Sequence, residues 1–384
     1  MEIYFDNSAT TRVSERVMRI VEKTMLEDYG NPSAKHRMGV NAERYVKDAA
    51  EKIAKTMKVS PKEILFTSGG TESDNLALIG CALARERRGK HLITSSIEHP
   101  AVYEPLTFLE SLGFEITVLP VDGKGHVSIE ELKAAIRPDT TIVSVMYVNN
   151  EMGGVEPVEE IARAVHEANP DTYFHVDAIQ AYGKYRILPK RLGIDLMSVS
   201  GHKLHGPKGV GFLYIDSRVR IRPILFGGGQ QGGLRSGTIN VPGIAGMGEA
   251  AAEAYEDFDA KTARITAVKD HLIDGLSGLP GVTVNSEKGA GSAPHIVSIS
   301  AEGVRSEVLL HALEDRGIYV SSGSACSSHH PGISGTLKGI GLPDELLDAT
   351  IRVSLCETNT EEEADRFLQE LAALLPMLRR FTRH

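Results

Sequence analysis

Short apolar runs with the length of strands alternate with helical patterns between residues 63 and 215 of the 384-residue chain. Such alternation is typical of a mostly parallel sheet whose two faces are covered by helices. The sequence therefore predicts an α/β fold with a seven-stranded large sheet. The expected strands are residues 63–66, 91–95, 115–119, 141–147, 173–176, 195–199 and 209–215.

A second region follows a long polar helix expected at residues 256–278. Its strand-like runs, at residues 282–285, 295–300 and 350–354, lie among helical patterns and predict a smaller α+β domain. The chain is long enough to bury two cores. We expect a large domain of residues 16–255 and a small domain formed by residues 1–15, an extended arm, together with residues 256–384.

Composition and charge limit the binding partners and the cellular compartment that can be expected for this protein. The net charge of −9 gives no general electrostatic reason to bind nucleic acid or an anionic membrane. No apolar run reaches the ~18 residues of a spanning helix, and the first residues lack the pattern of a secretion signal. The three cysteines, Cys81, Cys326 and Cys356, show no paired spacing, which favours a reducing compartment. We expect a cytoplasmic enzyme with no nucleic-acid or membrane partner.

A lysine stands in a Gly-rich turn directly after an apolar, strand-like run. This lysine, Lys203, comes 26 positions after Asp177, which ends an earlier strand. Pyridoxal phosphate chemistry requires such a pair, because the amine forms a Schiff base and the carboxylate keeps the pyridine nitrogen protonated. Ser200 and His202 flank the lysine and can donate to phosphate oxygens. On its own the pattern fits a solvated lysine in a turn better, so the hypothesis depends on the other parts of a cofactor site.

Further polar groups follow other strands of the predicted sheet, where open α/β sheets have their ligand crevice. Gly70 and Thr71 open a helix and could hold a phosphate, although Thr71 could equally be a helix cap. His99 could lie against a planar ring and shuttle protons. Asn150 could bond a ring hydroxyl or serve only as a turn residue. Gln180 leaves the next strand on the same face as the acid before it.

The second region carries two candidates for contact with a substrate. Cys326 lies among small residues, in a loop that can present a thiol to different partners, and we expect it to be reactive. Cys81 falls in a helical run and is expected to be structural, whereas the role of Cys356 stays open. Arg352, on an expected strand, can hold a carboxylate through two parallel bonds or can pair with a surface acid.

The residues described above lie in segments that, in this order along the chain, resemble the NifS/IscS-type cysteine desulfurases, which are pyridoxal phosphate enzymes of the class V aminotransferase superfamily. The resemblance runs from Tyr4 to about Glu363. It implies the fold type I of pyridoxal phosphate-dependent transferases and the conversion of L-cysteine to L-alanine with a persulfide left on the enzyme. The matching segments are residues 4–11, 30–33, 67–75, 98–99, 148–151, 175–178, 200–203, 235–238 and 322–326.

The resemblance also implies a role for each matching residue. Lys203 would be the Schiff-base lysine, Asp177 the partner of the pyridine nitrogen, and His99 a catalytic residue stacked on the ring. Cys326 would be the nucleophile that becomes a persulfide. The ring hydroxyl and the phosphate would be held by Gln180, Asn150, Gly70, Thr71, Ser200 and His202, joined by Thr238 from the other subunit of a homodimer. Arg352, with Asn31, would take the substrate carboxylate.

Two departures from the family pattern and three rival functions remain open. Cys356 stands where the family usually has a glycine, and His329 and His330 follow the loop cysteine. Cys326 would lend at most one ligand to an iron–sulfur cluster shared with the protein that accepts the sulfur, which would be an iron–sulfur scaffold protein or another thiol.

A selenocysteine lyase would use the same residues. A docking scaffold for an iron–sulfur assembly protein is the rival from another class, and a class V aminotransferase has no use for the loop cysteine.

Overall fold

The computed structural model describes residues 2–322 and 334–381. Its large sheet has seven strands in the order β2-β8-β7-β6-β5-β3-β4, all running in one direction except β8, which is antiparallel to both neighbours. The predicted α/β class and mostly parallel sheet are confirmed. The strands are β2 (Ile64–Thr67), β3 (His91–Ser95), β4 (Glu115–Leu119), β5 (Thr140–Ser144), β6 (Tyr173–Asp177), β7 (Leu196–Ser200) and β8 (Gly211–Ile215).

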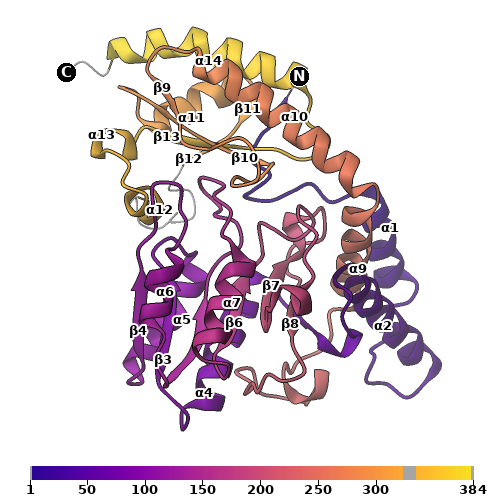
Figure 1. The fold of residues 1–384 in the computed structure, drawn as a ribbon. Coiled ribbons are helices and arrows are strands. Elements are labelled where there is room, and N and C mark those ends of the chain that lie inside the picture. Colours follow the sequence, from indigo (N-terminus) through magenta and orange to yellow (C-terminus); the bar gives the residue numbers. More distant parts are fainter. Residues whose placement is uncertain (1, 323–333, 382–384) are drawn as a thin grey trace.

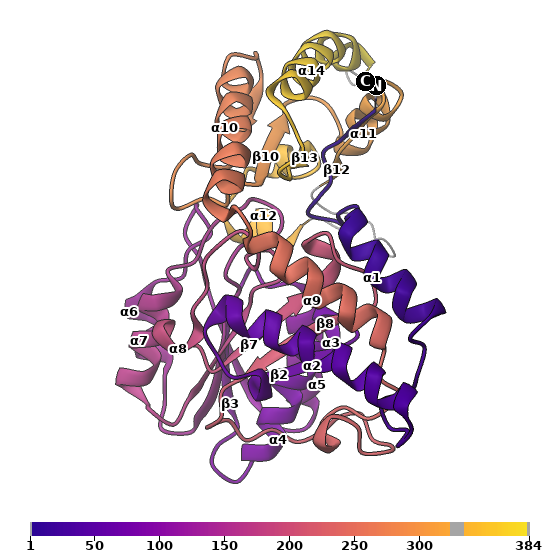
Figure 2. The same cartoon turned by 90° about the vertical axis from the view of Figure 1, so that its right-hand side faces the viewer.

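Alternate residues of these strands face two separate apolar layers, as the pleat of a sheet requires. Ile93 and Val143 point into the core beneath α2, α7 and α9, whereas their neighbours Leu92 and Ile142 point into the core beneath α4 and α5. Figures 1 and 2 show α1, α2 and α9 packed together at one side of the sheet. The helical segments are α1 (Glu15–Leu26), α2 (Arg37–Met57), η1 (Pro61–Glu63), α3 (Gly70–Asn75), η2 (Leu76–Gly80), α4 (Cys81–Arg85), α5 (Pro100–Ser111), α6 (Ile129–Ala135), α7 (Val158–Ala168), α8 (Pro189–Leu192), η3 (Gly201–Lys203), η4 (Gln231–Gly233) and α9 (Val241–Tyr255).

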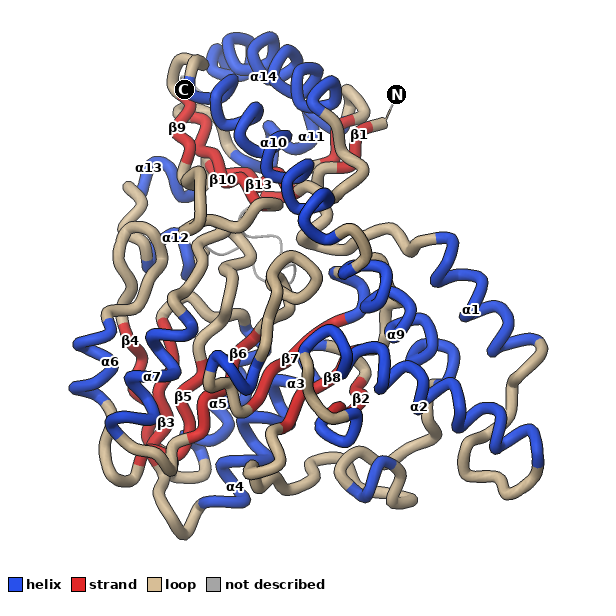
Figure 3. The backbone as a smooth tube through the Cα atoms, turned by 45° about the vertical axis from the view of Figure 1, so that its right-hand side comes forward, coloured by secondary structure: helices blue, strands red, loops and turns tan. Residues whose placement is uncertain are grey.

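A second core lies above the first, around an antiparallel sheet of order β12-β13-β10-β9 (Figure 3). The N-terminal arm joins this core, because Ile3 and Phe5 are fully buried in it and the Phe5 ring meets Phe367 edge-on at 6.0 Å. The elements are β1 (Ile3–Tyr4), α10 (Phe258–Ser277), β9 (Val282–Val284), β10 (Ile296–Ala301), α11 (Ser306–Glu314), β11 (Ile318–Tyr319), β12 (Ser321–Ser322), α12 (Gly335–Gly339), α13 (Asp344–Leu347), β13 (Thr350–Ser354) and α14 (Glu361–Phe381). Over the described part of the chain, no helix combines the length and the apolar character needed to cross a membrane.

Candidate active site

A pocket of about 200 Å³ lies at the carboxyl ends of the large-sheet strands, and the small sheet contributes to its wall through β13. This is the edge at which open α/β sheets bind ligands. Ten of the residues predicted from the sequence line this pocket: Gly70, Thr71, His99, Asn150, Asp177, Gln180, Ser200, His202, Lys203 and Arg352. The sequence prediction missed five further lining residues, which are Ser8, Ala101, Met146, Val148 and Ile179.

The Lys203 amine is held by the N-terminal arm. Lys203 ends the short helix η3 that directly follows β7. Its Nζ donates to the backbone carbonyls of Ser8 and Ala9, the latter at 2.9 Å. The arm therefore closes one side of the pocket and fixes the position of the amine.

Asp177 is the last residue of β6, and the residue is 5% exposed. The backbone N–H of Ile179 donates to Oδ1 at 2.9 Å. Burial raises the pKa of Asp177 to about 6, although the Ile179 N–H and the Lys203 ammonium both favour the charged form. Near neutral pH Asp177 therefore presents a negative charge to the pocket.

Asp74 and His175 lie in the core beside Asp177. The Asp74 carboxyl is fully buried, and its pKa is raised well above the usual value by burial and by the Asp177 charge. His175 Nε2 lies 3.5 Å from Asp74 Oδ1, and burial lowers the pKa of His175 to about 3. The charged forms of both side chains are disfavoured, so the negative charge of this region concentrates on Asp177.

His99 is both the N-cap of α5 and a wall of the pocket. The backbone N–H of Ala101 donates to His99 Nδ1 at 3.1 Å, and Pro100 occupies the first position of the helix. Because Nδ1 accepts this bond, the neutral ring carries its proton on Nε2. Burial and the nearby Lys203 ammonium lower the pKa of His99 to about 4, so the ring is a neutral Nε2–H donor at physiological pH.

The turn between β2 and α3 forms a cradle of small residues. Gly69 has φ of 151°, a conformation that favours glycine. A Cβ on Gly70 would lie 2.1 Å from Ile179 Cδ1, so any larger residue there would require the Ile179 side chain to move. The first N–H groups of a helix have no partner within the helix, and Thr71, Ser200 and His202 add donors around the same pocket. This donor set fits the phosphate of pyridoxal phosphate.

The amide of Gln180 is already engaged at the pocket wall. Its Nε2 donates to the Ser8 carbonyl at 3.0 Å, and its Oε1 lies 3.4 Å from His295 Nε2. Asn150 also lines the pocket, and its backbone carbonyl accepts from Arg352 Nη1 at 2.8 Å. The expected roles of Gln180 and Asn150 toward a ring hydroxyl remain predictions.

Arg352 projects from β13 into the pocket with 4% exposure. Besides the Asn150 carbonyl, its guanidinium binds Asp6 Oδ1 through Nη2 at 2.9 Å. Its buried Nε has no hydrogen-bond partner among the described residues. A guanidinium has five N–H donors, so Arg352 retains donors that could hold a carboxylate.

Two of the predicted residues that the structure describes, Asn31 and Thr238, do not line this pocket. Asn31 is exposed, and its Oδ1 accepts from the Ser33 N–H at 2.9 Å. Thr238 is also exposed, and its expected role concerns the other subunit of a dimer. Cys326 lies outside the described residues, as do His329 and His330. Of the other two cysteines, Cys81 is fully buried, whereas Cys356 lines a different pocket.

The chain is similar in sequence to known proteins over nearly its whole length. Residues 3–367 match the family described as Aminotransferase class-V. The chain is 43% identical to a "NifS/IcsS protein homolog" of Lactobacillus delbrueckii subsp. bulgaricus, over 95% of each chain. It is also 43% identical to "Cysteine desulfurase IscS" of Methanosarcina thermophila, over 98% of this chain and 93% of the relative.

Solved structures with the same arrangement are also found. One described as "NIFS-LIKE PROTEIN" is 41% identical, has a TM-score of 0.93, and matches 98% of this chain and 100% of its own. Another, "SspA in complex with cysteine", is 34% identical with a TM-score of 0.79, over 93% of this chain and 99% of its own.

Proposed function

The chain belongs to the aminotransferase class-V family and, within it, to the NifS/IscS-type cysteine desulfurases, and from this premise we propose that it converts L-cysteine to L-alanine. The sulfur would remain on the enzyme as a persulfide of Cys326. The observation that carries the proposal is that Lys203, Asp177, His99 and Arg352 line a single pocket.

We propose pyridoxal phosphate as the cofactor. When bound, it supplies an aldehyde that bonds amines and a ring that stabilises negative charge developing at the substrate Cα. Gly70, Thr71, Ser200 and His202 would hold its phosphate, helped by Thr238 from the other subunit of a homodimer. The Lys203 amine would bond the aldehyde, and the Asp177 carboxylate would hold a proton on the ring nitrogen. Gln180 and Asn150 would lie on the hydroxyl side of the ring.

Arg352 and Lys203 would each act on a different part of the amino acid substrate. Arg352 would bind the substrate carboxylate with guanidinium donors that the chain leaves available, and Asn31 would assist. Lys203, once its amine is free, would accept the proton from the substrate Cα. Its two carbonyl partners on the arm favour an ammonium and therefore support this proton uptake.

His99 and Cys326 would act on sulfur. The Nε2–H of His99 would donate a hydrogen bond to the substrate thiol and orient it. The Cys326 thiolate attacks that sulfur, an S–S bond forms and the substrate Cβ–S bond breaks. The electron pair of the broken bond leaves with Cβ, which gains a proton to become the methyl group of alanine. The sum of L-cysteine and a protein thiol is then alanine and a protein persulfide, with no external oxidant.

The direct test is incubation of the purified protein with pyridoxal phosphate and L-cysteine, followed by quantification of alanine and of sulfide released by a reductant. Equal amounts of alanine and sulfide are expected. Alanine without persulfide or sulfide would contradict sulfur transfer. The same assay with selenocysteine distinguishes the lyase alternative, which requires the higher kcat/KM for selenocysteine. A pure docking scaffold would form no alanine at all.

The sulfur acceptor is proposed to be an iron–sulfur scaffold protein or another protein thiol, to which the Cys326 persulfide passes its outer sulfur by thiol attack. Cys326 would contribute at most one ligand to a cluster shared with that acceptor. Sedimentation of the purified protein tests the homodimer that the Thr238 assignment requires.

A further inference from the structure

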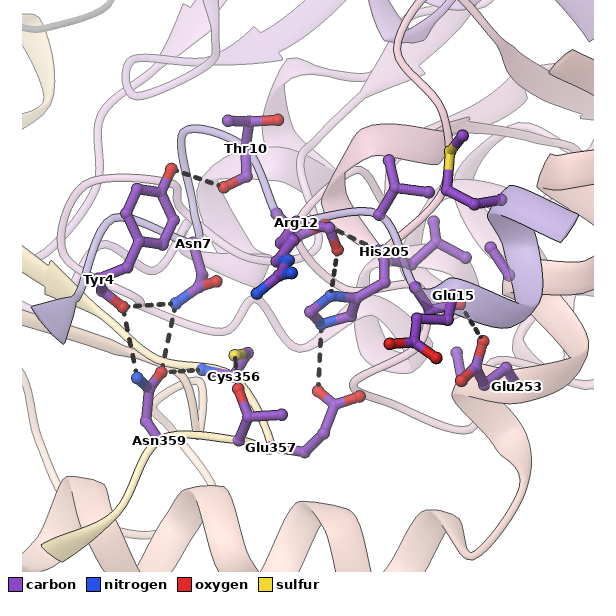
Figure 4. A pocket seen from close by; sticks show the side chains of 18 of the residues that line it. Tyr4, Asn7, Thr10, Arg12, Glu15, His205, Glu253, Cys356, Glu357 and Asn359 are labelled. Atoms are coloured by element: carbon purple, nitrogen blue, oxygen red, sulfur yellow. Dashed lines mark hydrogen bonds and ion pairs between the residues drawn. The ribbon is translucent and has the colours of Figure 1, made fainter. Parts of the chain in front are cut away.

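A second pocket of about 1170 Å³ is lined by the N-terminal arm, by the loop that follows Lys203 and by the turn that follows β13. Three possible metal ligands from distant parts of the sequence meet in its wall, namely His205, Cys356 and Glu357 (Figure 4). A ring nitrogen, the thiol sulfur and a carboxylate oxygen from these residues all lie within 4.8 Å of one another. One ion can therefore contact all three side chains after small adjustments.

The His205 ring is held in the orientation that metal-binding histidines adopt. Its Nδ1 lies 2.8 Å from the Arg12 carbonyl, and because a carbonyl only accepts, Nδ1 carries a proton. Metal-binding histidines usually donate their second ring N–H in this way, which directs the other nitrogen at the ion. The remaining nitrogen, Nε2, faces Glu357 Oε2 at 3.2 Å (Figure 4). This contact is an ion pair, and Cys356 and Glu357 raise the pKa of His205 to about 9 against the effect of burial. The metal-free site therefore holds a proton on Nε2, which an ion would displace on binding.

The other two ligands are positioned by the turn that joins β13 to α14. The Cys356 backbone N–H donates to Asn359 Oδ1 at 2.8 Å, and the Cys356 Sγ lies 3.2 Å from Thr358 Oγ1. Cys356 is 5% exposed. On the opposite side, His205 has φ of 62°, a costly conformation for a residue other than glycine. Its N–H donates to Thr11 Oγ1 at 2.8 Å, so the N-terminal arm holds the strained residue in place.

We propose that His205, Cys356 and Glu357 bind one divalent transition-metal ion of borderline softness, with Zn²⁺ as the best match. A thiolate, an imidazole and a carboxylate are the protein ligands that Zn²⁺ takes, whereas Mg²⁺ and Ca²⁺ prefer oxygen alone. The thiolate and carboxylate charges balance the ion. Three protein ligands leave a fourth tetrahedral position for water, which the pocket can supply.

Such an ion would link the two structural parts of the protein near the candidate active site. His205 follows Lys203 by two residues, and Cys356 follows Arg352 by four. Metal binding would therefore restrain the segments that carry these two side chains, and would stabilise the fold increasingly as the free metal concentration rises above the dissociation constant. The metal site does not depend on the proposed desulfurase activity, because its occupancy is measured without substrate.

The test is Co²⁺ binding to the full-length holoenzyme carrying Cys326→Ser, His329→Ala and His330→Ala, which removes the other cysteine–histidine cluster. One equivalent of Co²⁺ is expected, with the visible d–d bands of a tetrahedral site and a thiolate charge-transfer band. The d–d bands lie to the red of the cofactor absorption. Adding Cys356→Ser should abolish the charge-transfer band, whereas the matched control Cys81→Ala should keep it. A background protein that binds no Co²⁺, or a band that survives Cys356→Ser, would overturn the proposal.

Two further measurements guard against misfolded variants. Glu357→Gln keeps the shape of the side chain and should weaken Co²⁺ binding at least tenfold. It also removes the carboxylate that pairs with His205, so circular dichroism at the assay temperature checks that the variant is folded. The ammonium of Lys184 acts on both His205 and Glu357, and it repels a cation at the cluster. Lys184→Met should therefore tighten Co²⁺ binding several-fold. An unchanged dissociation constant in both variants would place the ion elsewhere and refute the assignment.

Discussion

The backbone N–H of Ala101 donates a 3.1 Å hydrogen bond to Nδ1 of His99, so one side chain both caps α5 and forms a wall of the pocket. Protonating Nδ1 would break the cap and place a second cation near Lys203. Burial, together with the Lys203 ammonium, lowers the His99 pKa to about 4, and loss of the cap would oppose the imidazolium further. The ring is thus fixed in one tautomer as well as in one position.

His99→Asn removes the imidazole but keeps a side chain that caps helices well. The kcat for alanine formation is expected to fall about 100-fold or more. Because the His99 pKa is lowered, the ring is neutral throughout the working range. The ratio of wild-type to variant kcat should therefore stay constant from about pH 6 to about pH 9. A pH–rate profile of each protein measures this ratio, and a ratio that changes with a midpoint near 6.5 would show that the ring titrates during turnover.

Asp177 makes cofactor affinity depend on pH. Its pKa is raised to about 6, so the free protein takes up a proton at Asp177 below that pH. Holding a protonated ring nitrogen requires the carboxylate, and binding must then release the proton. The affinity of the apoprotein for pyridoxal phosphate should fall as pH drops below about 6. Fluorescence titrations at several pH values measure it. Asp177→Asn should bind the cofactor more weakly and lose this dependence, whereas an equal pH dependence in both proteins would contradict the assignment.

The strand ends and the polar residues on them could be predicted because each carries a local signal. Asp177 and Ser200 end buried runs whose length and apolar character predict strands, and parallel strands bring their carboxyl ends to one edge. The expected strand at residues 141–147 stops earlier, at Ser144, although its apolar run continues. Of the three added residues, Val145 and Met146 are buried where the chain leaves the sheet for the pocket. A buried apolar run outside a sheet has the same sequence pattern as a buried strand.

The contacts of the arm could not be predicted from the sequence. Lys203 is bound by the carbonyls of Ser8 and Ala9, about 195 positions away, and a backbone carbonyl carries no side-chain signal. The meeting of His205 with Cys356 is equally non-local. The two-residue strands β11 and β12 were missed because a hydrophobic period needs more residues to be detected.

Lys203→Ala should abolish turnover, because no other amine among the described residues lines the pocket. The variant should also lack cofactor that borohydride can fix to the protein, which mass spectrometry of the reduced protein detects. Lys208→Ala is the matched control, since Lys208 lies five residues along the same loop and is exposed. Fixed cofactor at normal stoichiometry in Lys203→Ala would transfer the role to another lysine.

Arg352→Lys should raise KM for L-cysteine by roughly 10- to 100-fold, because an ammonium cannot reproduce the planar two-bond grip on a carboxylate. Cofactor content, measured by absorption after alkaline release, should change little. The companion variant Asp6→Asn removes the carboxylate that binds Nη2, and it should not raise KM. A KM that rises in Asp6→Asn but not in Arg352→Lys would mean that another residue takes the substrate carboxylate.

Cys326→Ser should keep the bound cofactor and still bind L-cysteine, yet release almost no sulfide. A hydroxyl is a poor nucleophile toward sulfur at neutral pH, whereas a thiol is already partly ionised. Cys356→Ser and Cys81→Ala are the comparison variants. Cys81 is fully buried with a raised pKa, and Cys356 is buried in the wall of the second pocket. Both should keep sulfide production within about twofold of wild type. Sulfide that persists in Cys326→Ser but disappears in Cys356→Ser would move the persulfide to Cys356, and with it the site at which sulfur leaves the enzyme.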